Sequence, residues 1–174
     1  MRRFPSPCRS RTGRCVTTMT PLTIRPLRAE DGPEAARVFF DSVREGTREH
    51  YAEAQRRAWA GDAPDPEGWR GRLWGVEGFA AEEDGRLVGF MTIGGAGYID
   101  LAFVAPTALG RGVGWRLYRA VEVKARELGA TALTTEASRM ARPFFERQGW
   151  SVVAEQVVVI RGVVLTYYRM RKAL

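Results

Sequence analysis

The segment with the clearest chemical potential is a short glycine-rich run, Ala108-Leu-Gly-Arg-Gly-Val-Gly-Trp115. Its three glycines alternate with other residues, which lets the backbone turn tightly and direct successive N–H groups toward one point. Apolar residues recur about every four positions afterwards, so a helix is expected to begin near Val113. The free amides and positive dipole end of a helix start attract anions. We therefore predict a phosphate-binding loop over Leu109 to Trp115, with Arg111 available for a further contact.

The spacing excludes two other phosphate-binding motifs. A dinucleotide-binding fingerprint requires a glycine where Trp115 stands, and the Gly-Lys-Ser or Gly-Lys-Thr of a nucleotide-triphosphate loop does not follow. A merely flexible strand-to-helix turn remains as an alternative. The position of the run, after Pro106 and before a long amphipathic helix, favours the anion site.

The segments around this loop predict an α/β domain in the order β-α-α-β-β-β-α-β-α-β-β. A capping-box pattern at Asp31 and Glu34 predicts a helix with Asp31 as its N-cap, and Asp84-Gly85 predicts a hairpin turn. Strands are expected over residues 22–27, 74–82, 86–93, 98–104, 131–136, 152–160 and 163–170. Helices are expected from residue 31, and over residues 52–59, 113–128 and 142–148. Hairpins beside a β-α-β crossover indicate a mixed, mostly antiparallel and twisted sheet flanked by about four helices.

The composition suits one ordinary globular domain, with 174 residues and 45% apolar content. No apolar run approaches the roughly 18–20 residues of a membrane span, so we expect a soluble, cytoplasmic protein that does not bind a membrane. The formal charge is +7, and five arginines before Met19 account for all but +2 of it. Both cysteines, Cys8 and Cys15, also precede Met19, which excludes disulfides, a cysteine nucleophile and zinc-thiolate sites from the remainder.

Residues 1–18 are rich in Arg, Ser, Thr and Pro and predict a disordered tail before a single domain at 19–174. Three interpretations of this tail stay open. It is an upstream extension of a gene whose true start is Met19, a disordered arm, or a transit-type segment. A secretory signal is disfavoured because no apolar stretch of about 7–15 residues follows the arginines.

The sequence resembles the GNAT superfamily, the Gcn5-related N-acetyltransferases. The resemblance is carried by Phe103-Val-Ala-Pro106, the glycine loop, the helix after it, and Glu136 to Trp150. With Ile24-Arg-Pro-Leu27 it extends over nearly the whole predicted domain. It is most similar to the bacterial YafP-like subgroup, which shares the segment at His50-Tyr51 and the hairpin at Arg161-Gly162.

This resemblance implies an N-acetyltransferase that uses acetyl-CoA as cosubstrate and no metal. It implies that the pantetheine arm pairs with the strand at Leu101–Val104 and that the pyrophosphate lies on the amides of residues 109–115. The residues implied to bind acetyl-CoA are Phe103, Val104, Leu109, Gly110, Arg111, Gly112, Val113, Gly114, Trp115, Ser138, Phe144 and Phe145.

Three positions depart from the pattern of many GNAT members. Leu109 stands where the pattern has Gln or Arg, but the contacts there are mostly main-chain, so binding is expected to survive. Ser138 replaces a common Asn and can still form a hydrogen bond. Phe145 replaces a Tyr that protonates the departing CoA thiolate. Either another acid or water serves, and a thiolate whose conjugate acid has a pKa of about 8–9 is a fair leaving group.

The implied reaction is direct attack by an amine on the thioester, with the oxyanion held by an amide near Val104. A carboxylate, acting directly or through water, is the natural base for an ammonium substrate. Glu136 is the first candidate, against a solvated strand-end charge or a helix-capping partner. Asp100 is the second, against a structural salt bridge or hydrogen bond, because a carboxylate within an apolar strand needs a partner or a use.

Further candidates come from aromatic residues and one histidine. His50 and Tyr51 stand where the family places its substrate-covering helices, and Tyr51 could replace the missing acid. The alternatives are a surface or capping role for His50 and plain packing for Tyr51. Tyr167 and Tyr168 should face opposite sides of their strand, so one could line the acceptor pocket or pack in the core. An aromatic wall over the acceptor site, or ordinary packing, is expected for Trp59, Trp69 and Trp74.

Two other functions compete with catalysis. A non-catalytic acyl-CoA-binding or sensor module on the same fold is suggested by Phe145. A nucleic-acid-binding role led by the arginine tail would show steeply salt-dependent affinity, and we disfavour it because residues 1–18 could lie upstream of the true start. The expected partner is an amine of a small molecule or peptide, with no nucleic acid, and the expected state is a monomer or homodimer.

Overall fold

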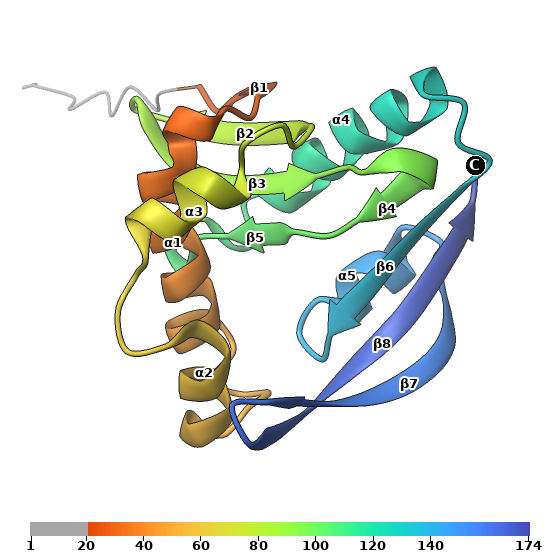
Figure 1. The fold of residues 1–174 in the computed structure, drawn as a ribbon. Helices are drawn as coiled ribbons and strands as arrows, with labels where there is room; N and C mark the ends of the chain where they lie inside the picture. Colours follow the sequence, from red (N-terminus) through yellow and green to blue (C-terminus); the bar gives the residue numbers. More distant parts are fainter. Residues whose placement is uncertain (1–20) are drawn as a thin grey trace, which may run out of the picture.

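The computed structural model describes residues 21–174 (Figure 1). The tail over residues 1–18 and the proposed start at Met19 lie outside these residues. The strands are β1 (Thr23–Pro26), β2 (Gly78–Glu83), β3 (Arg86–Thr92), β4 (Tyr98–Ile99), β5 (Ala102–Val104), β6 (Ala132–Ser138), β7 (Ser151–Ile160) and β8 (Val163–Ala173). The helices are α1 (Gly32–Asp41), α2 (Glu53–Ala60), α3 (Pro66–Arg72), α4 (Val113–Glu127) and α5 (Arg142–Arg147). Within the described chain, no helix is long and apolar enough to cross a membrane.

The predicted α/β class with mixed, mostly antiparallel strands is confirmed. The strands form two four-stranded sheets, in the orders β1-β2-β3-β5 and β4-β6-β8-β7. Among the strands of residues 21–174, only the β4–β6 pair is parallel. The hairpin at Asp84-Gly85 is confirmed as well, because both residues have positive φ, 53° and 72°.

The predicted continuous strand over residues 98–104 is wrong, because two sheets share this segment. Tyr98 and Ile99 pair with β6, whereas Ala102 to Val104 pair with β3. The chain changes sheets at Asp100-Leu101, so β5 and β6 separate instead of pairing (Figure 1). No strand of the described chain pairs with the second edge of β5.

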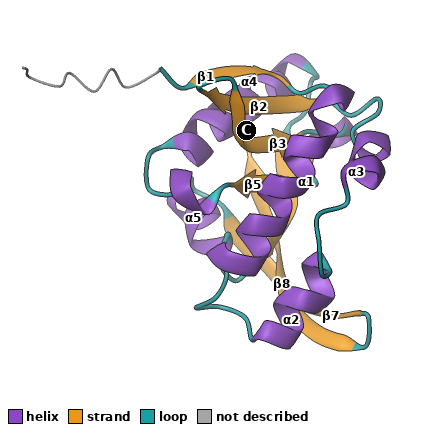
Figure 2. Cartoon of the chain, turned by 90° about the vertical axis from the view of Figure 1, so that its left-hand side faces the viewer, coloured by secondary structure: helices purple, strands orange, loops and turns teal. Residues whose placement is uncertain are grey.

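Helices cover both faces of the first sheet, because neighbouring residues of its strands pack in opposite directions. Ala80 and Phe90 pack with α1 and α3, whereas Ala81 and Met91 pack with α4. Figure 2 shows α1 and α3 on one side of the strands and α5 on the other. The predicted apolar stripe of α4 is buried except at its end, where Leu128 is 49% exposed. Sequence reasoning missed α3, a helix of seven residues.

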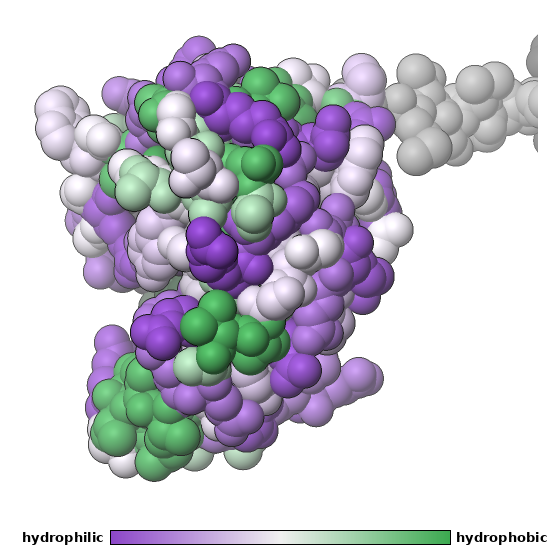
Figure 3. Space-filling view, turned by 90° about the vertical axis from the view of Figure 1, so that its right-hand side faces the viewer, coloured by the Kyte–Doolittle hydropathy of each residue, from purple (hydrophilic) through white to green (hydrophobic). Residues whose placement is uncertain are grey.

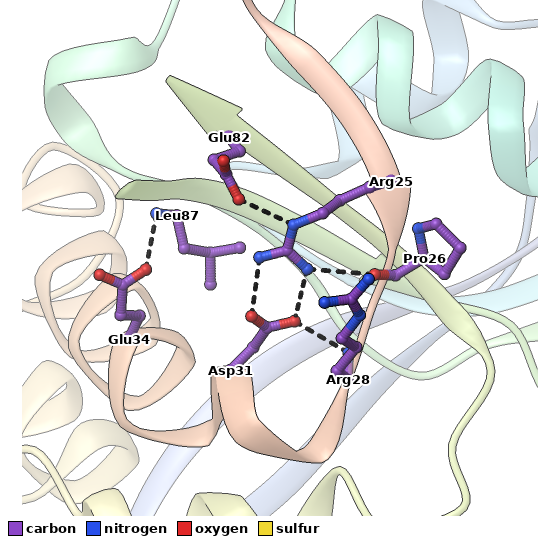
Figure 4. A network of polar contacts seen from close by, with 7 residues as sticks. All are labelled: Arg25, Pro26, Arg28, Asp31, Glu34, Glu82 and Leu87. Atoms are coloured by element: carbon purple, nitrogen blue, oxygen red, sulfur yellow. Dashed lines mark hydrogen bonds and ion pairs between the residues drawn. The ribbon is translucent and has the colours of Figure 1, made fainter. Parts of the chain in front are cut away.

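Asp31 is the N-cap residue of α1, as predicted, but its side chain forms no capping hydrogen bond because it has other partners. A 3₁₀ turn precedes α1, and the Asp31 carboxylate accepts two hydrogen bonds of 2.8 Å from Arg25 and one of 2.8 Å from the Arg28 amide (Figure 4). Burial would raise the pKa of Asp31, but the hydrogen bonds from Arg25 and Arg28 hold it below its ordinary value. Glu34 accepts a hydrogen bond of 2.7 Å from the Leu87 amide instead of completing a capping box.

The surface of the second sheet carries an apolar patch near the β7–β8 turn (Figure 3). Its members are exposed valines of these two strands, Val157, Val159 and Val164. β7 is also an edge strand of its sheet. The expectation of a monomer or homodimer stays a prediction.

A buried polar cluster ties α4 to β8, where the two sheets meet. The Glu122 carboxylate accepts hydrogen bonds from Lys172 at 2.7 Å and from the Tyr118 hydroxyl at 3.0 Å. Trp150 donates to the same hydroxyl at 3.2 Å. Burial would raise the pKa of Glu122, but its bonds to Lys172 and Tyr118 hold the pKa below the ordinary value of 4.5.

We predict that Glu122→Gln lowers the free energy of unfolding by about 1–2 kcal/mol at pH 7, since Lys172 and Tyr118 lose a charged partner. Urea denaturation measures this, with the exposed Glu127→Gln on the same helix as control. The lowered pKa stabilises the folded state above pH 4.5, and this contribution disappears as the pH falls through the folded-state pKa. The two proteins should therefore converge in acid, and equal stability at pH 7 would contradict the prediction.

Candidate active site

Two cavities meet at the separation between β5 and β6. The first has a volume of about 400 Å³ and the second about 480 Å³. Both volumes lie in the range of small-molecule sites. Six residues line both cavities: Trp59, Ala102, Phe103, Ser138, Ala141 and Phe145. The glycine loop lines only the first, and the two candidate carboxylates line only the second.

The open edge of β5 presents free backbone groups. The Ala105 amide donates to Val88 at 2.8 Å, and the Leu101 carbonyl accepts from Thr92 at 2.9 Å, so odd-numbered residues of this segment face β3. Because successive peptide groups alternate in direction, the N–H groups of Ala102 and Val104 face the open edge. These groups belong to the segment that the sequence predicts to pair with a pantetheine arm.

Ser42 is a site residue that sequence reasoning missed. Its hydroxyl lies 2.7 Å from the Val104 carbonyl oxygen at the open edge, and Ser42 also lines the first cavity. It stands where α1 ends and a π-helical turn over Ser42–Gly46 begins. No sequence signal marks it, because the contact joins residues 62 positions apart.

The predicted glycine loop has the backbone of an anion site. Gly110 and Gly112 have positive φ of 73° and 80°, and α4 begins at Val113 as expected. The Leu109 amide donates to Pro106, and the next donor in the described chain is the Arg116 amide, which bonds Gly112 at 3.0 Å. The amides of residues 110–115 donate to no backbone acceptor in the part of the chain that the structure describes. They are free donors at the start of a fifteen-residue helix.

Most other predicted acetyl-CoA contacts lie along the first cavity. Leu109, Val113, Gly114, Trp115, Phe103 and Val104 line it with Ser138, Phe144 and Phe145. A Cβ added at Gly114 would lie 3.4 Å from the Phe144 ring, so the glycine allows close packing there. Arg111 is the exception: it does not line the cavity, and its guanidinium pairs with Glu83.

Phe145 and Ser138 separate the two cavities near their junction. Phe145 is 1% exposed and packs against Trp150, with ring centroids 4.9 Å apart and ring planes tilted by 59°. Its ring carries no proton donor. The Ser138 hydroxyl accepts a hydrogen bond of 3.1 Å from the Ala141 amide, which orders the turn into α5.

The two candidate bases lie in different environments. Asp100 follows β4 instead of lying within a strand. It forms a salt bridge of 3.5 Å with Arg72, which is the structural role given above as the alternative to a role as base. Glu136 is exposed near the end of β6, and it forms no salt bridge with another residue of the described chain. Burial raises the pKa of the nearby Tyr98 hydroxyl, and the negative charges of Glu136 and Asp100 raise it further.

The structure does not bring His50 or Tyr51 to either cavity. His50 is exposed, and its amide donates to the Thr47 carbonyl at 2.9 Å. Tyr51 is 3% exposed, and its hydroxyl donates to the Thr166 carbonyl and accepts from the Arg139 amide, both at 2.9 Å. Burial raises the pKa of Tyr51. These bonds brace the start of α2 against β8.

Only some of the aromatic residues predicted to line the acceptor site lie at a cavity of the described chain. Trp59 lines both cavities, but Trp69 is buried in the core and Trp74 is 79% exposed. Tyr167 lines the second cavity, and Tyr168 lies on the other face of β8, 4.6 Å from the Arg142 guanidinium. Among residues 21–174, no three His, Cys, Asp or Glu side chains could hold a metal ion together.

Comparison with known proteins identifies the family. Residues 47–172 match the family described as Acetyltransferase (GNAT) domain. The uncharacterized N-acetyltransferase YafP of Escherichia coli strain K12 is 32% identical over 153 residues, which are 88% of this chain and 97% of YafP. The crystal structure of a GCN5-related N-acetyltransferase from Rhodopseudomonas palustris is 35% identical, with a TM-score of 0.82 over 91% of this chain and 99% of that one.

A more distant structure shares the fold alone. It is yncA from Salmonella typhimurium, a putative acetyltransferase solved with acetyl-CoA, which is 18% identical. Its TM-score is 0.66 over 89% of this chain and 95% of that one. The predicted resemblance to GNAT proteins, and to YafP within them, is confirmed. The chain therefore belongs to the GNAT family of acetyl-CoA-dependent N-acetyltransferases.

Proposed function

We propose that this protein transfers the acetyl group of acetyl-CoA to an amine of a small molecule or peptide, by direct attack in a ternary complex. The observation that carries the proposal is the junction of two cavities at the open edge of β5, one lined by the loop and one by Glu136. Three solved structures of the same fold support the choice of cosubstrate. They are yncA and a phosphinothricin acetyltransferase, each with acetyl-CoA, and a PaiA N-acetyltransferase with coenzyme A.

The first cavity holds acetyl-CoA in this proposal. The amides of residues 110–115 bind the pyrophosphate, and the free N–H group of Val104 binds the pantetheine arm. Phe144 packs beside Gly114, and Ser138 and Phe145 lie where the acetyl end meets the second cavity. The Arg111 guanidinium contacts the phosphate only when it leaves its salt-bridge partner Glu83.

The second cavity delivers the amine. Glu136 takes a proton from the ammonium, directly or through water, and the freed nitrogen attacks the thioester carbon. The N–H of Ala102, a residue that lines both cavities, stabilises the negative oxygen as the C–N bond forms. The carbon–sulfur bond then breaks, and the thiolate leaves. Solvent supplies its proton, because Phe145 has none to give and the Tyr51 hydroxyl is bonded to Thr166 and Arg139.

Leu109→Arg should tighten CoA binding about three- to tenfold, because it places a cation beside the proposed pyrophosphate site. Leu109 is 41% exposed, so the substitution should not disturb the core. Leu128→Arg is the matched control, since Leu128 is 49% exposed and follows the opposite end of α4. Isothermal titration calorimetry measures both dissociation constants. Equal tightening by the two variants would mean that overall charge, and not this loop, attracts CoA.

Glu136→Gln should lower kcat/KM for the amine about a hundredfold at pH 7, because the amide cannot accept the substrate proton. The deficit should shrink as the pH approaches the pKa of the amine, while the KM for acetyl-CoA stays unchanged. Glu155→Gln, on an exposed glutamate of β7, is the control and should keep full activity.

A thiol-release assay with acetyl-CoA and a broad panel of amines tests the function itself. Bound CoA without release of thiol for any amine would overturn catalysis. An acyl-CoA-binding or sensor module instead predicts that Glu136→Gln, Asp100→Asn and Tyr51→Phe leave background transfer unchanged.

A further inference from the structure

Aromatic side chains from several elements line part of the second cavity. Trp59 of α2 lies 5.6 Å from Tyr167 of β8 between ring centroids, at 85°, and 6.5 Å from Phe103 of β5. Phe39 of α1 stands 5.0 Å from Phe103 in an edge-to-face arrangement. Rings from four separate elements therefore line one space of about 480 Å³. Such a space favours a flat apolar group over a hydrated one.

The polar groups of this cavity leave an excess of negative charge. Its charged lining residues are Glu136, Asp100 and Arg72. Arg72 pairs with Asp100 at 3.5 Å, and Glu136 has no salt-bridge partner in the described residues, including its register neighbour Arg169. Burial raises the pKa of Tyr167, with further contributions from Tyr51 and Glu136, so the Glu136 charge acts on this aromatic wall. A cation beside Glu136 and over these rings is stabilised by both.

The same charges disfavour a substrate carboxylate. The only cationic side chain that lines the cavity in the described chain is Arg72. Its guanidinium is held by Asp100 on one side and by the face of Trp69, 5.3 Å away, on the other. An α-amino acid would therefore place its carboxylate near Glu136 without a free cation to bind it.

We propose that the second cavity selects an arylalkylamine, a primary ammonium carried on a short chain from an aromatic ring and lacking a carboxylate. The ring lies among Trp59, Phe103 and Tyr167, and the ammonium lies beside Glu136, two positions along β6 from Ser138, which lines both cavities. This inference rests on the proposed acetyl transfer, and it deepens that proposal by naming the acceptor.

The first test compares three acceptors in the thiol-release assay: 2-phenylethylamine, n-butylamine and L-phenylalanine. The value of kcat/KM for 2-phenylethylamine should exceed the other two at least tenfold. A preference for n-butylamine or L-phenylalanine, or equal rates, would overturn the acceptor class while leaving acetyl transfer intact. Absence of thiol release with all amines would overturn acetyl transfer instead. Calorimetry of 2-phenylethylamine with the CoA-loaded protein then still tests the cavity, and no measurable heat would overturn it.

Two pairs of variants locate the binding. Tyr167→Leu should raise the KM for 2-phenylethylamine at least fivefold and leave the KM for acetyl-CoA unchanged. Tyr168→Leu, on the opposite face of β8, is the control and should leave both KM values unchanged. Arg72→Gln should lower the KM for 2-phenylethylamine at least twofold, because it frees Asp100. Arg70→Gln, whose partner is Glu67 on the same helix, is the control. A rise in KM with Arg72→Gln, or equal effects within either pair, would contradict the assignment.

Discussion

The site depends on one constraint, the transfer of a single chain segment from one sheet to the other at Asp100-Leu101. Tyr98 and Ile99 are committed to β6, and Ala102 to Val104 are committed to β3. The two sheets must diverge beyond that point, which leaves the edge of β5 without a strand partner in the described chain. Backbone N–H groups that would be hydrogen-bonded to a neighbouring strand in a continuous sheet therefore remain available to a ligand. The cluster around Glu122 and Lys172 holds the sheets together where they meet.

The divergence also decides which chemistry each side can perform. On one side, the start of α4 offers free amides, which suits a phosphate held by main-chain contacts. On the other side, aromatic rings and the exposed Glu136 carboxylate line the same cavity. In the proposed complex, main-chain amides make most of the contacts with CoA, so Leu109 can replace a polar residue at small cost. Phe145 lies at the junction and donates no proton, so in the proposed reaction the departing thiolate relies on its own stability.

Local signals predicted the parts of the fold that local interactions determine. The glycines at 110 and 112, the amphipathic α4 and the Asp84-Gly85 hairpin each follow from a few neighbouring residues. The break at Asp100 does not follow from neighbouring residues, because the apolar pattern of residues 98–104 is the same for one continuous strand and for two short strands in different sheets. Asp31 occupies the predicted N-cap position, yet its carboxylate bonds Arg25 and the Arg28 amide instead of an amide of α1. The contacts of Ser42 and Arg72 join segments that are distant in the sequence, so no local motif could predict them.

Hydrogen–deuterium exchange of the backbone amides, with and without CoA, tests the central claim most directly. The account predicts fast exchange at Ala102, Val104 and residues 110–115 in the free protein, since these amides lack protein acceptors. It predicts strong protection of the same amides on addition of CoA, with little change at Phe103, whose amide faces β3. Protection of the open edge and the loop before CoA is added, or no change at both after saturation, would contradict it.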